Sequence, residues 1–142
     1  IEDNRFNLHG VDNGWSHLVD DAAAADKAAA CMPSNHTQWA IQYEIREEAS
    51  DANPWHCYAE LRCDAKAESG TALAVGIYDA RGQKHVMQRS VPIAEVAGKE
   101  YKTLDLGTHN LSAGMYFWVS PVNNPEQVET VYVDRFFVVR ER

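Results

Sequence analysis

Residues 55–65 read WHCYAELRCDA, a stretch in which every second side chain is small or apolar. The odd positions from Trp55 to Ala65 carry Trp, Cys, Ala or Leu, whereas the even positions carry polar or charged groups and one tyrosine. Successive side chains of a β-strand point to opposite faces of its sheet. The pattern therefore predicts one long strand with one buried face and one solvent-exposed face.

Three further segments alternate in the same way, and a fourth is rich in β-branched and aromatic residues. They are Trp39–Ile45, Leu73–Ile77, Met115–Ser120 and the expected last strand, Thr130–Val139. Turn-forming residues separate the runs, and Asp79-Ala80-Arg81-Gly82 indicates a hairpin. Short strands at this spacing predict an all-β chain, a two-sheet antiparallel β-sandwich of the jelly-roll type with eight or nine strands.

The alanine-rich stretch Asp20–Ala30 is compatible with two structures. Alanine favours a helix, but so short a run is marginal as a helix. We expect a loop that enters a short strand at Ala28–Met32, with helix elsewhere limited to short turns.

The length of the chain and its net charge limit the number of domains and the classes of partner. The 142 residues suffice for one domain with its own core, and we assign residues 1–142 to a single domain. The formal charge of -8 argues against nucleic acid and anionic membranes as partners. No apolar run reaches membrane-spanning length. Because the chain starts at Ile1 without a signal peptide, we interpret it as a mature form or a fragment of a longer protein.

The cysteines are Cys31, Cys57 and Cys63, and an odd count gives no disulfide framework. Cys57 and Cys63 share one face of a predicted strand at a separation of roughly 20 Å, too far for a bridge. A bridge from Cys31 to either one stays open. The alternative is three small buried hydrophobic residues.

Motifs of known enzymes are absent from the sequence. We find no nucleophile elbow, phosphate-binding loop, dinucleotide fingerprint or zinc-protease motif. The six histidines lack the spacing of zinc ligands. Acidic residues are numerous enough that a catalytic carboxylate pair stays open, but we expect a protein that is not an enzyme.

Aromatic residues give a stronger functional signal. Tyr116 and Trp118 alternate with better core residues, so they are expected to face outward side by side. Sugar rings stack on such platforms, and the amides of Asn123 and Asn124 in the next loop could bond sugar hydroxyls. Packing under loops or a neighbouring domain is the alternative. Trp39 falls on the apolar register and is expected in the core or at a strand end.

A second outward row contains Tyr58, Glu60 and Arg62. Arginine and carboxylate groups supply the directional hydrogen bonds that a polyhydroxylated ligand needs. We therefore regard this row as a second candidate for carbohydrate binding.

Carboxylates near the two ends of the chain suggest a metal site. Asp20, Asp21 and Asp26 lie in the early loop, and Asp134 lies within the apolar last strand. A charge in such a strand needs a partner. Calcium is one partner, since it binds carboxylate and carbonyl oxygens, and a basic side chain such as Arg135 is the other.

Five segments follow one another in an order typical of one family: His17–Asp21, Ala25–Ala29, Gln38–Gln42, Tyr116–Pro121 and Val131–Phe136. Together they resemble a galactose-binding-like jelly roll of the carbohydrate-binding-module type, from about Trp15 to Val139. Such modules are appended to large secreted bacterial proteins, including glycosidase-like ones similar to alpha-glucuronidases. The resemblance implies a secreted, cell-surface or periplasmic location.

The resemblance also implies a structural calcium near the chain ends, held by the early acidic loop and an aspartate of the last strand. Asp134 matches that aspartate, whereas Lys27 stands where relatives commonly have glycine. Relatives bind sugar on a sheet face or at loops, and some bind none. Our leading hypothesis is a non-catalytic module that holds an attached enzyme on a glycan. The alternative is a structural sandwich that packs on a glycosidase-like parent domain in the same chain.

Overall fold

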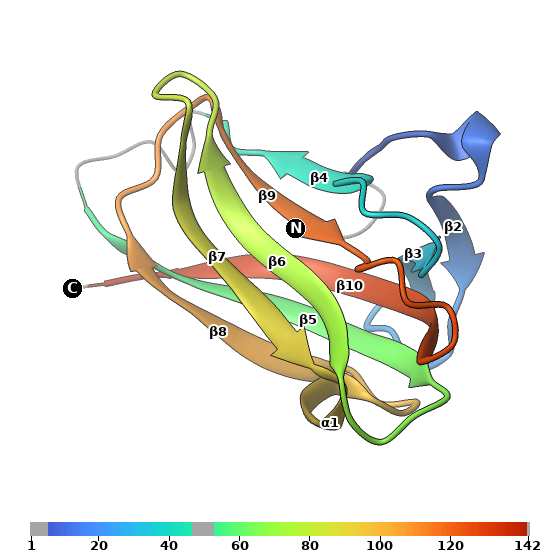
Figure 1. Ribbon diagram of the computed structural model, residues 1–142. Helices are drawn as coiled ribbons and strands as arrows, with labels where there is room; N and C mark the ends of the chain where they lie inside the picture. The colour runs from blue at the N-terminus through green and yellow to red at the C-terminus, as the bar shows by residue number, and fades with distance from the viewer. Residues whose placement is uncertain (1–5, 47–52, 142) are drawn as a thin grey trace.

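A computed structural model describes residues 6–46 and 53–141 of the chain as two antiparallel sheets packed face to face (Figure 1). The first, here the β6 sheet, has the order β1 (Asn7–Leu8), β4 (Ile41–Glu44), β9 (Met115–Ser120), β6 (Thr71–Asp79) and β7 (Lys84–Pro92). The second, the β5 sheet, has the order β2 (His17–Asp20), β3 (Ala28–Pro33), β10 (Val128–Arg140), β5 (Trp55–Ala65) and β8 (Lys102–His109).

The all-β sandwich predicted from the sequence is confirmed. The described residues form ten strands rather than eight or nine. The count differs because a strand as short as β1, with two residues, is too short to produce a pattern. The hairpin at residues 79–82 joins β6 to β7 as expected.

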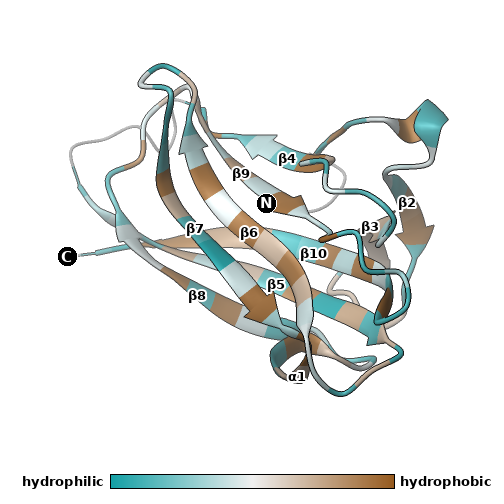
Figure 2. Cartoon of the chain, viewed as in Figure 1, coloured by the Kyte–Doolittle hydropathy of each residue, from teal (hydrophilic) through white to brown (hydrophobic). Residues whose placement is uncertain are grey.

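Alternation along the strands builds the core between the sheets. In β5 the odd positions from Cys57 to Cys63 are fully buried, as the sequence pattern predicts. Phe117 of β9 and Phe136 of β10 come from opposite sheets and stack with ring centroids 4.9 Å apart. Figure 2 shows bands of different hydropathy following one another along β6, β7 and β10.

Among residues 6–46 and 53–141, helix is confined to a 3-10 turn (η2, Val11–Asn13) and to α1 (Ile93–Val96), whose two terminal residues are buried. The alanine-rich stretch forms turns and then enters β3 at Ala28, as expected. In the described ranges no helix has the length and hydropathy needed to span a membrane.

All three cysteines are free and buried, so the possible bridge from Cys31 does not form. Cys57 and Cys63 are part of the core. Cys31 instead lies 3.3 Å from Nε2 of His17 through its Sγ atom. Burial raises the pKa of the Cys31 thiol to about 11, so the thiol is protonated at neutral pH.

Candidate functional site

Five rings gather on the outer face of the β6 sheet: Trp39, Tyr78, His85, Tyr116 and Trp118. Trp39 lies flat on Trp118, with centroids 4.1 Å apart and planes 4° apart. Three rings meet Trp39 at steep angles, Tyr78 at 5.6 Å, His85 at 5.4 Å and Tyr116 at 6.2 Å. Trp39 is half-buried, and its second face carries no stacked ring from the described residues. The arrangement is a flat indole platform beside a wall of steeply inclined rings.

Gly76 explains how Trp118 can lie under this platform. Gly76 pairs with Trp118 in the ladder between β6 and β9. A Cβ atom at Gly76 would lie 2.7 Å from Cε2 and Cζ2 of Trp118 and from the carbonyl oxygen of Met87. Glycine is therefore the residue that lets the indole lie across β6. With Trp39 above it, Trp118 is only 2% exposed.

Trp39 was expected in the core or at a strand end, and the structure places it outside the core, just before β4 begins at Ile41. The expectation extended the inward register of Ile41 back along the chain. β4 begins only at Ile41, and just before it the amide of Ala40 donates to the carbonyl of Gln38 at 2.8 Å. This three-residue turn places Ala40 in the core, fully buried, and Trp39 on the outer face.

Three hollows surround the platform. The Trp39 hollow, of about 480 Å³, is lined by His9, Trp15, Thr37, Gln38, Trp39 and Gln42. The β6 trough, of about 360 Å³, is lined by Ala74, Gln88, Arg89, Ser90 and Trp118. The Tyr116 hollow, of about 280 Å³, is lined by Asn7, His9, Gln42, Glu44, Ala80, Gly114 and Tyr116. The first and third hollows share His9 and Gln42, so the concave surface continues across the strands β1, β4 and β9.

The predicted platform residues Tyr116 and Trp118 both lie on this face, but the stacking surface expected on Trp118 is covered by Trp39. Asn123 and Asn124 line none of the three hollows. Asn124 is buried because its amide donates to the carbonyl of Thr71 at 2.7 Å and its oxygen accepts from the Ser34 hydroxyl at 2.6 Å. Asn124 therefore fastens the loop after β9, and Asn123 is exposed.

The second predicted row lies on the opposite side of the molecule, on the outer face of the β5 sheet. Tyr58 stacks between His56 and Phe137, with centroids 4.6 and 4.8 Å away. Glu60 accepts hydrogen bonds from Arg135 at 2.6 and 3.3 Å. These two side chains are thus engaged by neighbours on their own face, and the row does not join the aromatic platform.

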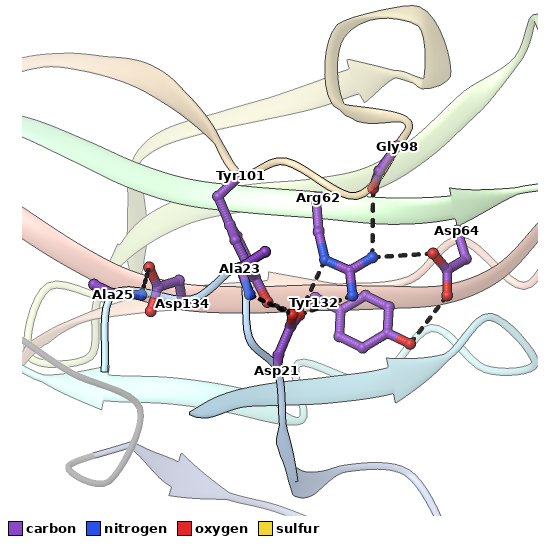
Figure 3. Close-up of polar contacts among 9 residues, drawn as sticks. All are labelled: Asp21, Ala23, Ala25, Arg62, Asp64, Gly98, Tyr101, Tyr132 and Asp134. Carbon is purple, nitrogen blue, oxygen red and sulfur yellow. Dashed lines mark hydrogen bonds and ion pairs between the residues drawn. The ribbon is translucent and has the colours of Figure 1, made fainter. Parts of the chain in front are cut away.

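Arg62, the third member of that row, is the centre of a nearly closed polar cluster (Figure 3). Its Nε and Nη2 atoms donate to Oδ2 of Asp21 at 3.1 and 2.8 Å, and its Nη1 atom donates to Oδ1 of Asp64 at 3.0 Å. The guanidinium lies 3.7 Å from the ring centroid of Tyr132, and the hydroxyl of Tyr101 donates to Asp21 at 2.7 Å. Arg62 therefore ties the early loop to β5 and is sealed from a ligand.

Opposing effects set the pKa of Asp21. Burial acts to raise it, but hydrogen bonds from Tyr101, Arg62 and the amide of Ala23 together hold the pKa below its ordinary value. Asp21 is therefore ionised at neutral pH, and its charge is matched by that of Arg62. The side chains of Asp21 and Arg62 are 10% and 9% exposed.

Protein groups hold the carboxylates proposed as calcium ligands. Asp134, 2% exposed, accepts a hydrogen bond from the amide of Ala25 at 3.0 Å, so the early loop does cross the last strand there. Asp26 accepts from the amide of Ala28, and Asp20 is exposed at the end of β2. Lys27, with a φ of 65°, adopts the left-handed conformation for which glycine is better suited.

Within the described ranges no group of three or more His, Cys, Asp or Glu side chains is arranged to hold a metal ion. The hydrogen-bond donors around Asp21 and Asp134 are amide, guanidinium and phenol groups, and they occupy the Oδ2 atom of each carboxylate. These contacts do not fit a calcium ion bound between the loop and β10. The calcium predicted from the sequence is untested at this position, and these hydrogen bonds argue against it.

No family model and no curated protein matches the chain. Solved structures do match. The CBM22-1–GH10 modules of an endo-1,4-beta-D-xylanase from Clostridium thermocellum, complexed with xylohexaose, align over 100% of this chain and 27% of theirs, with a TM-score of 0.62 and 11% identity. The CBM22-1 xylan-binding domain from Paenibacillus barcinonensis aligns over 88% of this chain and 80% of its own, with a TM-score of 0.59 and 8% identity.

A GH26-CBM35 beta-(1,4)-mannanase from Podospora anserina also aligns, over 100% of this chain and 27% of its own, with a TM-score of 0.60 and 13% identity. The chain spans about a quarter of the length of the first of these enzymes and of the mannanase. At such low identity the similarity establishes the fold alone. It confirms the resemblance in fold to the jelly rolls of carbohydrate-binding modules.

Proposed function

We propose that this chain is a non-catalytic carbohydrate-binding module and that its binding surface is the outer face of the β6 sheet. The observation that carries the proposal is the indole of Trp39, supported from below by Trp118 and stacked by no other described ring. The C–H groups of a sugar ring pack on such an aromatic face. The hollows beside it present amide and hydroxyl groups, as sites for small polar ligands do.

The residues that line the hollows favour binding over hydrolysis. Glu44 is the one carboxylate among those lining the three hollows. Glycoside hydrolysis generally uses two carboxylic acid groups on either side of the scissile bond. The described surface around the platform therefore supports adhesion to a glycan.

The proposal includes an attached glycan-degrading enzyme in a secreted protein. The xylanase and mannanase similar to this chain each combine a binding module with a glycosidase module. The competing role is a structural sandwich whose aromatic face packs on a catalytic domain. That role requires no affinity of the isolated chain for any glycan.

Replacement of the platform residue tests the binding role. Trp39→Ala should lose about 1–3 kcal/mol of binding free energy, the value of a buried aromatic anchor, which is roughly a fivefold to 150-fold weaker affinity. Its melting temperature should change little, because the indole is only half-buried and lies outside the core. Affinity electrophoresis in gels containing xylan, mannan or beta-1,3-galactan measures the loss.

Phe137→Ala is the matched control, since it removes a half-buried ring from the outer face of the other sheet. It should bind as the unaltered chain does. Retention of full affinity by Trp39→Ala would place the site elsewhere. Absence of binding to every polysaccharide tested would favour the structural role.

A further inference from the structure

We infer that the β6 trough is a subsite for one uncharged sugar ring of the bound glycan, next to the Trp39 platform. This inference rests on the proposed function. The trough exists because the outward positions of β6 have almost no side chain. Ala74 and Gly76 form its floor, and their ladder partners Ser90 and Gln88 on β7 form one side. On the other side stand Ser120 and Trp118 of β9.

The dimensions fit a single ring. Adjacent strands lie about 4.8 Å apart, so the rows on β7 and β9 are separated by roughly 10 Å across the floor. The trough has a volume of about 360 Å³, within the range of sites for small ligands. Trp118 lies under the platform and also lines the trough, so a glycan stacked on Trp39 would continue into the trough without leaving the sheet face.

The trough offers hydrogen bonds, and Arg89, the one charged residue that lines it, is paired with Glu95. Gln88 and Ser90 are exposed and carry an amide and a hydroxyl. Nε1 of Trp118 is buried and has no hydrogen-bond partner in the described part of the chain. It is bonded to Cε2, the ring atom that lies over Gly76 at the end of the trough. A buried donor without an acceptor is costly, and a hydroxyl of the ligand would supply the acceptor.

Arg89 does not supply a positive charge to the trough. It pairs in the ladder with the core residue Val75, so its side chain leaves the sheet on the side away from Ala74 and Gly76. Its Nη2 atom bonds both carboxylate oxygens of Glu95 at 2.6 and 2.7 Å. Although Arg89 lines the trough, its charge is therefore already neutralised by Glu95.

Charge therefore selects the ligand class. A carboxylate or sulfate group in the trough would lose water without gaining a cationic partner. Glu44, the carboxylate that lines the Tyr116 hollow, and the net charge of -8 add repulsion. The geometry points to neutral oligosaccharides, and glycans with uronic acid or sulfate at this position are excluded.

Isothermal titration with neutral and acidic probes tests the inference. The neutral probes are xylohexaose, mannohexaose and beta-1,3-galactotriose, and the acidic probe is hexagalacturonate. The unaltered chain should bind at least one neutral probe more than tenfold tighter than the acidic one. Ala74→Leu fills the trough and should weaken that binding at least tenfold, whereas Ala94→Leu, on the exposed side of α1, should not.

A gain of function completes the test. Gln88→Lys places an ammonium group in the trough and should improve binding of hexagalacturonate at least tenfold. Thr103→Lys makes the same charge change on the other sheet and should have no such effect. Equal affinity of the unaltered chain for acidic and neutral probes, or full affinity of Ala74→Leu, overturns the subsite. Loss of binding in Trp39→Ala together with full affinity of Ala74→Leu would leave the proposed function standing without the subsite. Absence of binding by every probe would overturn both the subsite and the proposed function.

Discussion

Gly76 determines whether the aromatic platform can form. Its missing Cβ leaves the space that Cε2 and Cζ2 of Trp118 occupy, and the carbonyl oxygen of Met87 limits movement on the other side. Because one of the two neighbours is backbone and the other is held under Trp39, neither can yield cheaply. We predict that Gly76→Ala lowers the free energy of unfolding by about 1–3 kcal/mol, the cost of overpacking, and weakens glycan binding as well.

Urea unfolding and affinity electrophoresis measure the two effects. The control is Gly82→Ala, where the added methyl would approach the carboxylate end of Asp79 rather than backbone or a packed ring. That carboxylate is the end of a side chain, held at an exposed turn by the amides of Arg81 and Gly82, so the control should lose less stability and no affinity. A Gly76→Ala variant that binds normally would show that Trp118 need not lie across β6.

At the level of single elements, the loop at residues 21–27 is fastened to β5 mainly by charge. Asp21 and Arg62 are both nearly buried, and removal of one partner leaves the other without its counter-charge. We predict that Asp21→Asn loses about 3 kcal/mol of stability at pH 7, as for a broken buried ion pair. Asp26→Asn, in the same loop but exposed, should be close to neutral.

The pH dependence of this loss follows from the lowered pKa of Asp21. A carboxyl with a lower pKa in the folded chain stabilises it fully above the unfolded-state pKa of about 3.9, and the contribution fades as the pH falls through the folded-state pKa. The stability gap between the unaltered chain and Asp21→Asn should therefore be widest at neutral pH and narrow below pH ~4. Urea titrations at several pH values measure it, and a constant gap would contradict the role of the charge.

Strands of the core could be predicted from the sequence, since their alternation is the direct record of burial. β5 has the bounds expected from the pattern, and the inward residues of β6 and β9 are the expected ones. The face occupied by Trp39 could not be predicted, because one tight turn at Gln38–Ala40 shifts the register. The alternation of residues does not reveal such a turn. Gly76 was the available signal: a glycine inside a strand pattern indicates a close approach by another group.

The ion-pair partners of the charged residues could not be predicted from the sequence either. Arg62 and Asp21 were assigned to a sugar site and to a metal site, yet 41 positions apart they bind each other. Local patterns report which face a side chain occupies but not which distant loop covers that face. For this reason the outer row of β5 and the outer row of β9 were both candidates in the sequence, although the second lies beside the hollows described above and the first is engaged by ion pairs and stacked rings.

For the whole molecule, the outer faces of the two sheets differ in their chemistry. The β6 sheet presents rings, amides and hydroxyls around its hollows, whereas the β5 sheet presents the ion pairs of Arg62 with Asp21 and of Arg135 with Glu60. Replacement of an outward ring such as Trp39 should therefore change binding with little change in stability, whereas removal of an ion pair on the β5 sheet should change stability without changing binding.

A calcium ion bound between the early loop and β10 would join the two ends of the chain. A ligand that binds only the folded state raises the melting temperature by mass action. Because Arg62 neutralises Asp21 and the amide of Ala25 bonds Asp134, we expect the melting temperature to be the same in millimolar calcium and in excess EDTA. Differential scanning calorimetry in both buffers measures it. A rise of several degrees with calcium, abolished in Asp134→Asn, would show that these carboxylates hold the metal and that the hydrogen bonds seen here give way to it.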